Sequence, residues 1–282
     1  MPELPEVETM RRGLQPIVGL TIRDARCLPC SRKPLTITPG WNAFQKRLSG
    51  RKIAGLGRVG KRVVIELDND DRLIFEPRMT GLVLLADPPT IEHLRLAIDF
   101  TRSTAPSLQY WDRRGLGIVR LVTADEFTQR YLQGDIGPDA LTISAEEFRE
   151  RLKPSRRAIK VALLDQKQVA GVGNLYASEM LYAARIDPRR RCDQLRGDDW
   201  QRLHTALREI LEDAILHEGS TLSDGTYRNA LNKAGGYQNH HRVYDRADEP
   251  CPACRQPIQR IVQAQRSTFF CPKCQTRKRS SH

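Results

Sequence analysis

The sequence predicts an α+β protein with several domains, in which an N-terminal β-sandwich with a leading helix precedes a helical domain and a short C-terminal cysteine module. Three observations lead to this prediction. Short β-rich segments bounded by turn residues recur from about residue 50 to 122. Beyond a cluster of Gly, Asp and Pro at 134–139, apolar residues adopt helical spacing. Two C-x-x-C pairs then stand near the end of the 282-residue chain, which is long enough for more than one core.

The leading helix is expected to begin near Pro5, because proline favours the first helical turn. Glu6 and Glu8 complement the positive end of the helix dipole. The apolar stripe consists of Val7, Met10 and Leu14. Six β-rich segments follow, at 63–67, 72–75, 82–85, 94–100, 108–111 and 117–122. Short strands at such spacing favour a β-sandwich or barrel.

Helices dominate the second half of the sequence. Ser144 and Glu147 predict a capping box for a helix over 144–152. Further helices are expected at 156–165, 175–185 and 198–218, followed by a long polar loop over 219–250. We therefore predict domains at 1–134, 135–240 and 241–282.

The net charge of the chain limits the kinds of partner that it is expected to bind. With 46 Lys and Arg against 34 Asp and Glu, the formal charge is +12 and the pI about 9.6. A polyanion is the expected ligand, with nucleic acid ahead of an anionic membrane surface. No run approaches the roughly 18 apolar residues of a spanning helix, and no signal-peptide pattern is present, so we expect a soluble, cytoplasmic protein.

Four cysteines predict a metal site. Cys251 and Cys254 form one C-x-x-C pair and Cys271 and Cys274 another, with sixteen residues between the pairs. Two tight turns can then present four thiolates tetrahedrally to one Zn²⁺. Because no coordination position is left for water, the zinc should be structural. The remaining cysteines, Cys27, Cys30 and Cys192, are expected to be free thiols.

Two basic or glycine-rich features suggest a clamp for nucleic-acid phosphates. The cysteine module carries Arg260, Arg266 and the basic tail 277–279. Between two predicted helices, Gly171 and Gly173 allow positive φ, and Asn174 can cap the next helix, leaving amide N–H groups for a phosphate. The alternative for this turn is a simple connection between helices.

The residues before the first helix suggest a reaction centre. If Met1 is removed, as the small second residue favours, Pro2 becomes a secondary amine that can condense with a sugar aldehyde carbon to form a cationic iminium. Glu3 then lies one residue away to transfer protons. The alternative is that both residues only lead into the helix.

Five blocks of sequence resemble the formamidopyrimidine-DNA glycosylases, in the superfamily that also holds the endonuclease VIII enzymes. They are residues 1–8, 60–61, 78–81, 165–179, and Tyr244 with the cysteine module and 265–270. The resemblance covers the whole chain. It implies a helix-two-turn-helix domain with a lesion-capping loop at about 219–237, a zinc-finger β-hairpin, and DNA bound between the domains. It also implies a base-excision-repair enzyme for 8-oxoguanine and ring-opened purines that has lyase activity at abasic sites.

The resemblance implies roles for particular residues. Pro2 would be the nucleophile that attacks C1′ of the damaged nucleotide, and Glu3 the acid that assists ring opening and base loss. Lys61 would contact a phosphate near the lesion, and Asn174 and Arg266 would grip phosphates around the everted nucleotide; Lys61 and Arg266 are counted with the catalytic set. Successive β- and δ-elimination through the iminium would then cut the strand without an organic cofactor.

Three side chains are implied to fill the gap left by the everted nucleotide: Met79, Arg114 and Leu116. His93 is also expected to contact DNA. The chain departs from the family at Leu116, where Phe is usual, and at Gly115, where a second basic residue is usual. A Leu wedge lacks aromatic stacking worth about 1–3 kcal/mol per base, so an altered lesion search is expected.

A second departure is Glu76-Pro77, where the family commonly has His-Leu. A carboxylate at this position would repel a nearby phosphate. We therefore expect a local rearrangement or a missing DNA contact.

Three alternatives remain. An endonuclease VIII-type enzyme for oxidised pyrimidines usually has Gly where this chain has Leu4, and the segment 235–237 resembles the end of the loop that covers oxidised guanine. A catalytically inactive relative that binds damaged DNA would not need the intact catalytic residues. A membrane-surface protein would need a basic amphipathic helix, whereas 198–218 carries mixed charge. We therefore predict a monomeric enzyme that acts on duplex DNA at the nucleoid.

Overall fold

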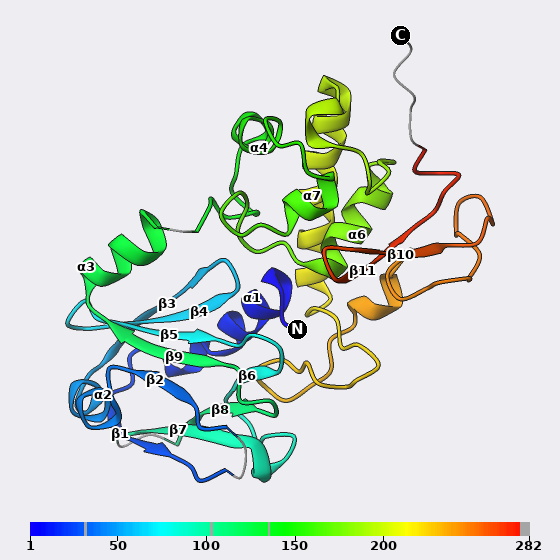
Figure 1. Cartoon of the computed structure of the whole chain (residues 1–282). Coiled ribbons are helices and arrows are strands. Elements are labelled where there is room, and N and C mark those ends of the chain that lie inside the picture. Colours follow the sequence, from blue (N-terminus) through cyan, green and yellow to red (C-terminus); the bar gives the residue numbers. More distant parts are fainter. Residues whose placement is uncertain (31–32, 102–103, 135, 277–282) are drawn as a thin grey trace. The chain divides into compact units, whose positions relative to one another are not determined.

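The computed structural model describes residues 1–30, 33–101, 104–134 and 136–276. The chain divides into two compact units (Figure 1). The first unit comprises Met1–Gly134 and Ile215–Gln238, and the second comprises Asp135–Ala214 and Asn239–His282. The sequence places residues 219–237 in the predicted helical domain, whereas in the structure they belong to the first unit.

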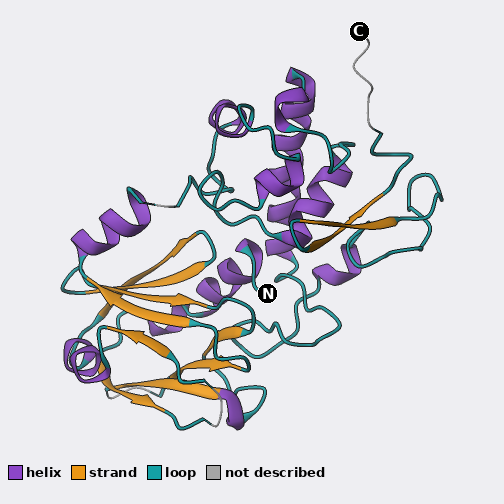
Figure 2. Cartoon of the chain, in the orientation of Figure 1, coloured by secondary structure: helices purple, strands orange, loops and turns teal. Residues whose placement is uncertain are grey.

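Two sheets build the first unit (Figure 2). The strands are β1 (Ile22–Cys27), β2 (Thr36–Thr38), β3 (Ile53–Val59), β4 (Arg62–Leu67), β5 (Arg72–Glu76), β6 (Gly81–Leu84), β7 (Leu94–Phe100), β8 (Leu108–Asp112) and β9 (Ile118–Val122). One sheet has the order β1-β7-β8-β6 and the other β2-β9-β5-β4-β3. All neighbours are antiparallel except β2 and β9. Each of the six β-rich segments forms a strand, which confirms the α+β prediction.

Helices of the first unit flank these sheets. They are α1 (Leu4–Gly13), the 3₁₀ turn η1 (Gln15–Ile17), α2 (Trp41–Leu48), the 3₁₀ turn η2 (Ile91–His93), α3 (Ala124–Phe127) and the π-helical turn η3 (Thr128–Leu132). The apolar stripe expected on α1 is confirmed, because Val7, Met10 and Leu14 are fully buried. Helix α1 contacts both sheets, through β3 and β4 of one and β6 of the other.

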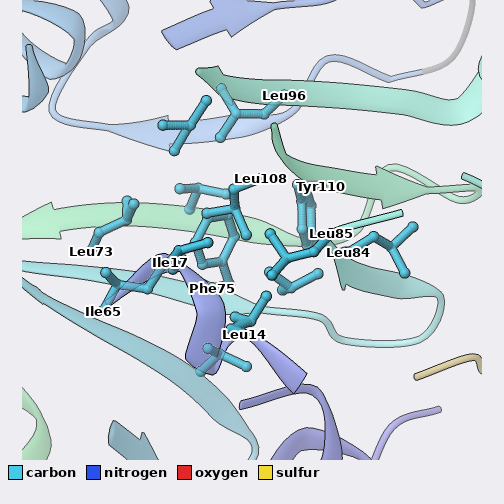
Figure 3. Packing of buried hydrophobic residues seen from close by; sticks show 14 of the residues in the cluster. Leu14, Ile17, Ile65, Leu73, Phe75, Leu84, Leu85, Leu96, Leu108 and Tyr110 are labelled. Carbon is cyan, nitrogen blue, oxygen red and sulfur yellow. The ribbon is translucent and has the colours of Figure 1, made fainter. Parts of the chain in front are cut away.

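One apolar core fills the space between the two sheets (Figure 3). Phe75 from β5 and Tyr110 from β8 meet there with ring centroids 5.5 Å apart. Leu14, directly after α1, and Ile17, in η1, enter the same cluster. Burial of such side chains contributes roughly 1.5–3 kcal/mol each, so this core holds α1 and the residues before it against the sandwich.

The second unit is helical with one hairpin. Its elements are α4 (Ala145–Leu152), α5 (Ile159–Leu163), α6 (Asn174–Ala183), the 3₁₀ turn η4 (Cys192–Gln194), β10 (Gln259–Gln263) and β11 (Arg266–Phe270). Helix α7 (Gly197–Leu216) begins in this unit, and the 3₁₀ turn η5 (Tyr237–His240) ends in it. No helix in the described part of the chain is both long and apolar enough to cross a membrane.

Two helix starts differ from the prediction. At α4, the Glu147 N–H donates to Ser144 Oγ at 3.1 Å, but the Glu147 carboxylate accepts from Arg151 Nε rather than closing a capping box. The helix expected at 156–165 shortens to α5, because Ala158 forms an antiparallel bridge with Arg191. Pairing with a distant segment has replaced the first helical turn.

Candidate active site and metal centre

The start of helix α1 places Pro2 and Glu3 in a buried setting. Pro2 is buried and Glu3 is 4% exposed. Glu3 is the N-cap residue of α1, and its backbone N–H donates to the Glu6 carboxylate at 2.8 Å. The helix start and the candidate reaction centre are therefore the same structure, because the hydrogen bond that begins the helix also fixes the backbone beside Pro2.

Glu6 links this helix start to the segment 215–238. Its second carboxylate oxygen accepts the Ser220 N–H at 2.8 Å, and the Tyr227 hydroxyl donates to the Glu218 carbonyl at 3.0 Å. Glu6 is only 3% exposed. The sequence suggested only a dipole role for this residue, because its partner Ser220 is 214 positions away. The segment predicted to cover a damaged base thus begins next to Pro2 and Glu3.

The base of the 219–237 loop is closed by backbone hydrogen bonds. Gly236 N–H donates to His217 O at 2.8 Å, and Tyr237 N–H donates to Gly219 O at 2.9 Å. At Gly235, an added Cβ would lie 2.3 Å from the Gly219 carbonyl oxygen, so only glycine fits this approach. The loop therefore has fixed ends, as a compact surface loop requires.

A buried ion network supports the turn that carries Lys61. Glu8 accepts hydrogen bonds from Arg11 and Arg12, and Arg58 Nε lies 3.2 Å from the same carboxylate. Burial alone would raise the pKa of Glu8, but these three guanidinium groups lower it to about 2. Arg58 also donates to the Gly60 carbonyl at 2.9 Å. Because Gly60 and Lys61 form the turn between β3 and β4, the network holds Lys61 in place.

Asp112 organises the turns that present Met79, Arg114 and Leu116. Its carboxylate accepts from the Thr80 hydroxyl, from the Arg114 N–H at 3.2 Å and from the Gly117 N–H at 2.7 Å. Met79 and Leu116 are 38% and 39% exposed, so both apolar side chains are accessible at the surface. The structure therefore places all three side chains at the surface of adjoining turns within the first unit.

The same turn contacts the 215–238 segment through Arg113, for which the sequence predicts no role. Arg113 donates to the Thr226 hydroxyl at 2.9 Å, and it lies 3.9 Å from the Asp224 carboxylate. His93 packs against the end of strand β8 and is only 8% exposed, with its ring edge-on to Trp111 at 5.6 Å between centroids. His93 therefore exposes only a small part of its side chain for a contact with DNA.

In the second unit, Asn174 does not cap helix α6 as predicted. It is the first residue of the helix, and Gly173 is the N-cap residue with φ −129°. Of the two glycines, only Gly171 has a positive φ, at 107°. The Gly171 N–H donates to the Gln166 side chain at 3.0 Å, so this amide is engaged within the turn. The Gly171 amide is therefore not free to bind a phosphate.

A buried lysine holds Asn174 instead. Lys160 Nζ donates to Asn174 Oδ1 at 2.7 Å and to Ser267 O and Thr268 Oγ1, each at 2.8 Å. Lys160 is 1% exposed. Because Arg266 directly precedes Ser267 at the start of β11, the lysine ties the Asn174 turn to the strand of Arg266. A lysine near the start of a short helix gave no sequence signal for this role.

Arg266 is exposed at the tip of the β10–β11 hairpin. Ala264 and Gln265 have φ values of 45° and 60°, which is the geometry of a two-residue type I′ turn. The basic tail residues 277–279 lie outside the described residues.

Glu179 is a further residue for which the sequence predicts no role. It is fully buried and accepts three backbone N–H bonds, from Arg242, Val243 and Tyr244, at 3.0, 3.0 and 2.7 Å. Burial raises the pKa of Glu179 although these hydrogen bonds oppose it. The carboxylate thus anchors the chain just before the cysteine module to helix α6.

The four cysteine sulfurs come together as predicted. The Sγ atoms of Cys251, Cys254, Cys271 and Cys274 all lie within 4.8 Å of one another. The Cys254–Cys271 and Cys251–Cys274 pairs are 3.4 and 3.8 Å apart. A tetrahedral zinc with Zn–S bonds of about 2.3 Å requires sulfurs roughly 3.8 Å apart. The geometry therefore fits one structural Zn²⁺, which would order the hairpin that bears Arg266.

Comparisons with known proteins agree with this architecture. Three family models match in order: the formamidopyrimidine-DNA glycosylase N-terminal domain at residues 1–119, the formamidopyrimidine-DNA glycosylase H2TH domain at 136–226, and the zinc finger found in FPG and IleRS at 248–277. The chain is 40% identical over 280 residues to the formamidopyrimidine-DNA glycosylase of Chloroflexus aurantiacus, with 98% of each chain covered. It is 37% identical over 278 residues to that of Streptococcus mutans, with 98% and 99% covered.

Solved structures show the same similarity. The MutM (Fpg) protein from Thermus thermophilus matches with a TM-score of 0.85 and 38% identity, covering 97% of this chain and 98% of that one. A complex of Lactococcus lactis Fpg with DNA containing an abasic site matches with a TM-score of 0.87 and 37% identity, covering 98% and 100%. The similarity therefore extends over both units and the cysteine module.

Proposed function

This chain belongs to the formamidopyrimidine-DNA glycosylase family, and from that premise we propose that it removes 8-oxoguanine and ring-opened formamidopyrimidines from duplex DNA and then cleaves the abasic site. One observation within the molecule supports this most directly. Glu6 connects the Pro2-Glu3 helix start to Ser220, at the beginning of the loop expected to cover the damaged base. A nucleophile and a base-covering segment are thus held together by one buried carboxylate.

The chemistry follows from the two residues at the start of α1. Once Met1 is removed, the Pro2 amine attacks C1′, and the bond from C1′ to the damaged base breaks. Glu3 supplies a proton as the sugar ring opens, leaving an iminium between Pro2 and C1′. The iminium accepts electrons when a proton leaves C2′, so the C3′–O bond breaks, and a second elimination breaks the C5′–O bond. Hydrolysis of the remaining adduct frees the enzyme.

The other residues bind and shape the DNA. Within the first unit, Lys61 contacts a phosphate, and the exposed Met79, Arg114 and Leu116 enter the gap left by the everted nucleotide. His93 adds at most an edge contact, because its ring is buried.

In the second unit, Asn174 and Arg266 grip backbone phosphates. Their common support by Lys160 favours this assignment, because two phosphate ligands that act on one strand need a fixed spacing. The Zn²⁺ site serves only to order the hairpin of Arg266.

Borohydride trapping tests the nucleophile. Reduction of the iminium should leave a covalent protein–DNA adduct on a duplex with an abasic site. Pro2→Gly has no secondary amine and should trap far less DNA than the wild-type protein, whereas Lys153→Met, an exposed substitution in the second unit, should trap equally well. Equal trapping by Pro2→Gly would refute the assignment, and intact mass showing Met1 retained on active protein would do the same.

A substrate panel tests the proposed lesion class. Duplexes carrying 8-oxoguanine, ring-opened guanine or an oxidised pyrimidine, each opposite all four bases, are incubated with the protein and borohydride. Trapping should be strongest with the two oxidised purines. A preference for the oxidised pyrimidine would instead support the endonuclease VIII-type activity, and binding without trapping on any duplex would indicate an inactive relative.

A further inference from the structure

Three arginines surround one buried carboxylate on the five-stranded sheet. The Glu76 side chain is 7% exposed. Arg120 forms a hydrogen-bonded ion pair with one of its oxygens, and the other lies 3.3 Å from Arg62 Nε and 3.7 Å from an Arg78 nitrogen. We call Glu76, Arg62, Arg78 and Arg120 the Glu76 cluster.

Strand register explains why these residues meet. Strand β5 lies between β4 and β9, with Val63 opposite Phe75 and Ile74 opposite Arg120. Phe75 points into the core between the sheets (Figure 3), so its neighbour Glu76 points to the opposite face. The same alternation brings Arg62 and Arg120 to that outer face beside Glu76.

The cluster changes the expectation for this departure from the family. The sequence predicts that the Glu76 carboxylate repels a nearby phosphate. In the structure its charge is more than balanced, because three guanidinium groups face one carboxylate and leave a formal charge of +2. This excess of positive charge attracts a further anion.

The three arginines are not equally engaged. Arg62 and Arg120 side chains are 23% and 18% exposed, and the Arg62 guanidinium also lies over the Tyr131 ring at 5.6 Å. Arg78 makes the longest contact with Glu76 and is 55% exposed. Its backbone φ of 54° turns the chain between β5 and β6, immediately before Met79. Arg78 is therefore the member whose guanidinium is available to an outside anion.

We propose that the Glu76 cluster is a binding site for a backbone phosphate of duplex DNA, with Arg78 in direct contact and Arg62 and Arg120 supplying additional positive potential. A guanidinium can bind a phosphate through two parallel hydrogen bonds. The cluster adjoins the turns of Lys61 and Met79, which precede Arg62 and follow Arg78 in the chain. The choice of DNA as the source of the phosphate rests on the proposed function, whereas the anion site itself rests on the charges.

Salt-dependent DNA binding by Arg78 variants tests the site. Affinity for a duplex with a reduced abasic-site analogue is measured from low to high salt for the wild-type protein, Arg78→Ala, Arg78→Lys and Arg72→Ala. Arg72 is the matched control, because it lies at the other end of β5 and its loss changes the net charge equally. Arg78→Ala should reduce the slope of log affinity against log salt by roughly one, while Arg72→Ala should leave it close to wild type and Arg78→Lys should restore most of it.

Thermal unfolding of each variant accompanies the titration. Because Arg78 is largely exposed, all three variants should fold and unfold at nearly the wild-type temperature. A wild-type slope for folded Arg78→Ala would overturn the proposal, and so would an equal reduction for Arg72→Ala, which would indicate general charge alone.

Borohydride trapping at saturating DNA separates this site from the reaction. Arg78→Ala should form as much adduct as the wild-type protein once the DNA concentration is raised, because the phosphate contact affects binding and not the Pro2 amine. A failure of the wild-type protein to trap any DNA would count against the proposed function, while the slope of Arg78→Ala would still decide the phosphate site. Loss of trapping by Arg78→Ala at saturation would overturn its role as a binding residue.

Discussion

Lys160 Nζ lies 2.7 Å from Asn174 Oδ1, and this contact joins two residues that are 14 positions apart in the sequence. The ammonium group of Lys160 is fully buried. Its other acceptors belong to strand β11, beside Arg266. A buried charge with three hydrogen-bond acceptors holds its neighbours in one arrangement, because each acceptor left unpaired costs about 1–3 kcal/mol.

We expect Lys160→Met to destabilise the protein by roughly 2–5 kcal/mol, because the apolar chain can occupy the space but cannot satisfy three oxygen atoms. DNA binding should also weaken at a temperature where the variant is folded, since Asn174 loses its partner. Urea unfolding and DNA titration measure the two effects. Lys153→Met, which removes the same charge from an exposed site, should change stability by less than about 0.5 kcal/mol. Similar stabilities for the two variants would contradict this account.

The Glu8 network predicts a loss of stability in acid. The pKa of Glu8 is about 2 in the folded protein against an ordinary value of 4.5, so its contribution is present above 4.5 and disappears as the pH falls towards 2. The lowered pKa of Glu8 corresponds to at most about 3 kcal/mol in the free energy of unfolding. Glu8→Gln should therefore be clearly less stable than wild type at pH 7 and nearly equal to it close to pH 2.

Denaturant unfolding at a series of pH values measures this difference. The exposed substitution Glu150→Gln serves as the control and should differ little from wild type at any pH. A gap between wild type and Glu8→Gln that does not shrink in acid would show that the Glu8 charge is not the stabilising group.

The Arg113–Thr226 hydrogen bond predicts a link between the turn of Arg114 and the 219–237 loop. Arg113→Ala and Thr226→Val should each increase amide hydrogen exchange in this loop severalfold, because each removes one of its side-chain ties to the sandwich. Arg114→Ala is the matched control, since it removes the same charge from the adjacent position. Equal exchange in all three variants would mean that the loop is held only by its base and by Glu6.

Removal of zinc should disorder the hairpin of Arg266. An isolated two-stranded hairpin is marginally stable, so the four-cysteine site is expected to supply much of the folding free energy there. Metal analysis should find one zinc per chain, and Cys254→Ser should lose it together with tight DNA binding. Cys27→Ser, at an exposed thiol, should retain both. Folded, DNA-binding protein without zinc would refute the structural role.

Local patterns in the sequence were enough to predict many elements. The six β-rich segments all form strands, because β-branched and aromatic residues, and the turn residues that bound them, act over only a few positions. The apolar stripe of α1 and the two cysteine pairs were equally evident, since helical spacing and metal-ligand spacing are both local. Asn174 as a helix cap was a local prediction that failed, because Lys160 engages its side chain.

The sequence by itself determined the candidate chemistry of this protein: an amine at Pro2 with a carboxylate beside it, a four-cysteine site, and a basic composition suited to DNA. Only the tertiary structure decided what surrounds that chemistry. Glu6 reaches Ser220 across 214 positions, and Glu76 collects arginines from two other strands. Such contacts depend on strand register and on the burial of charge, and neither can be read from a window of neighbouring residues.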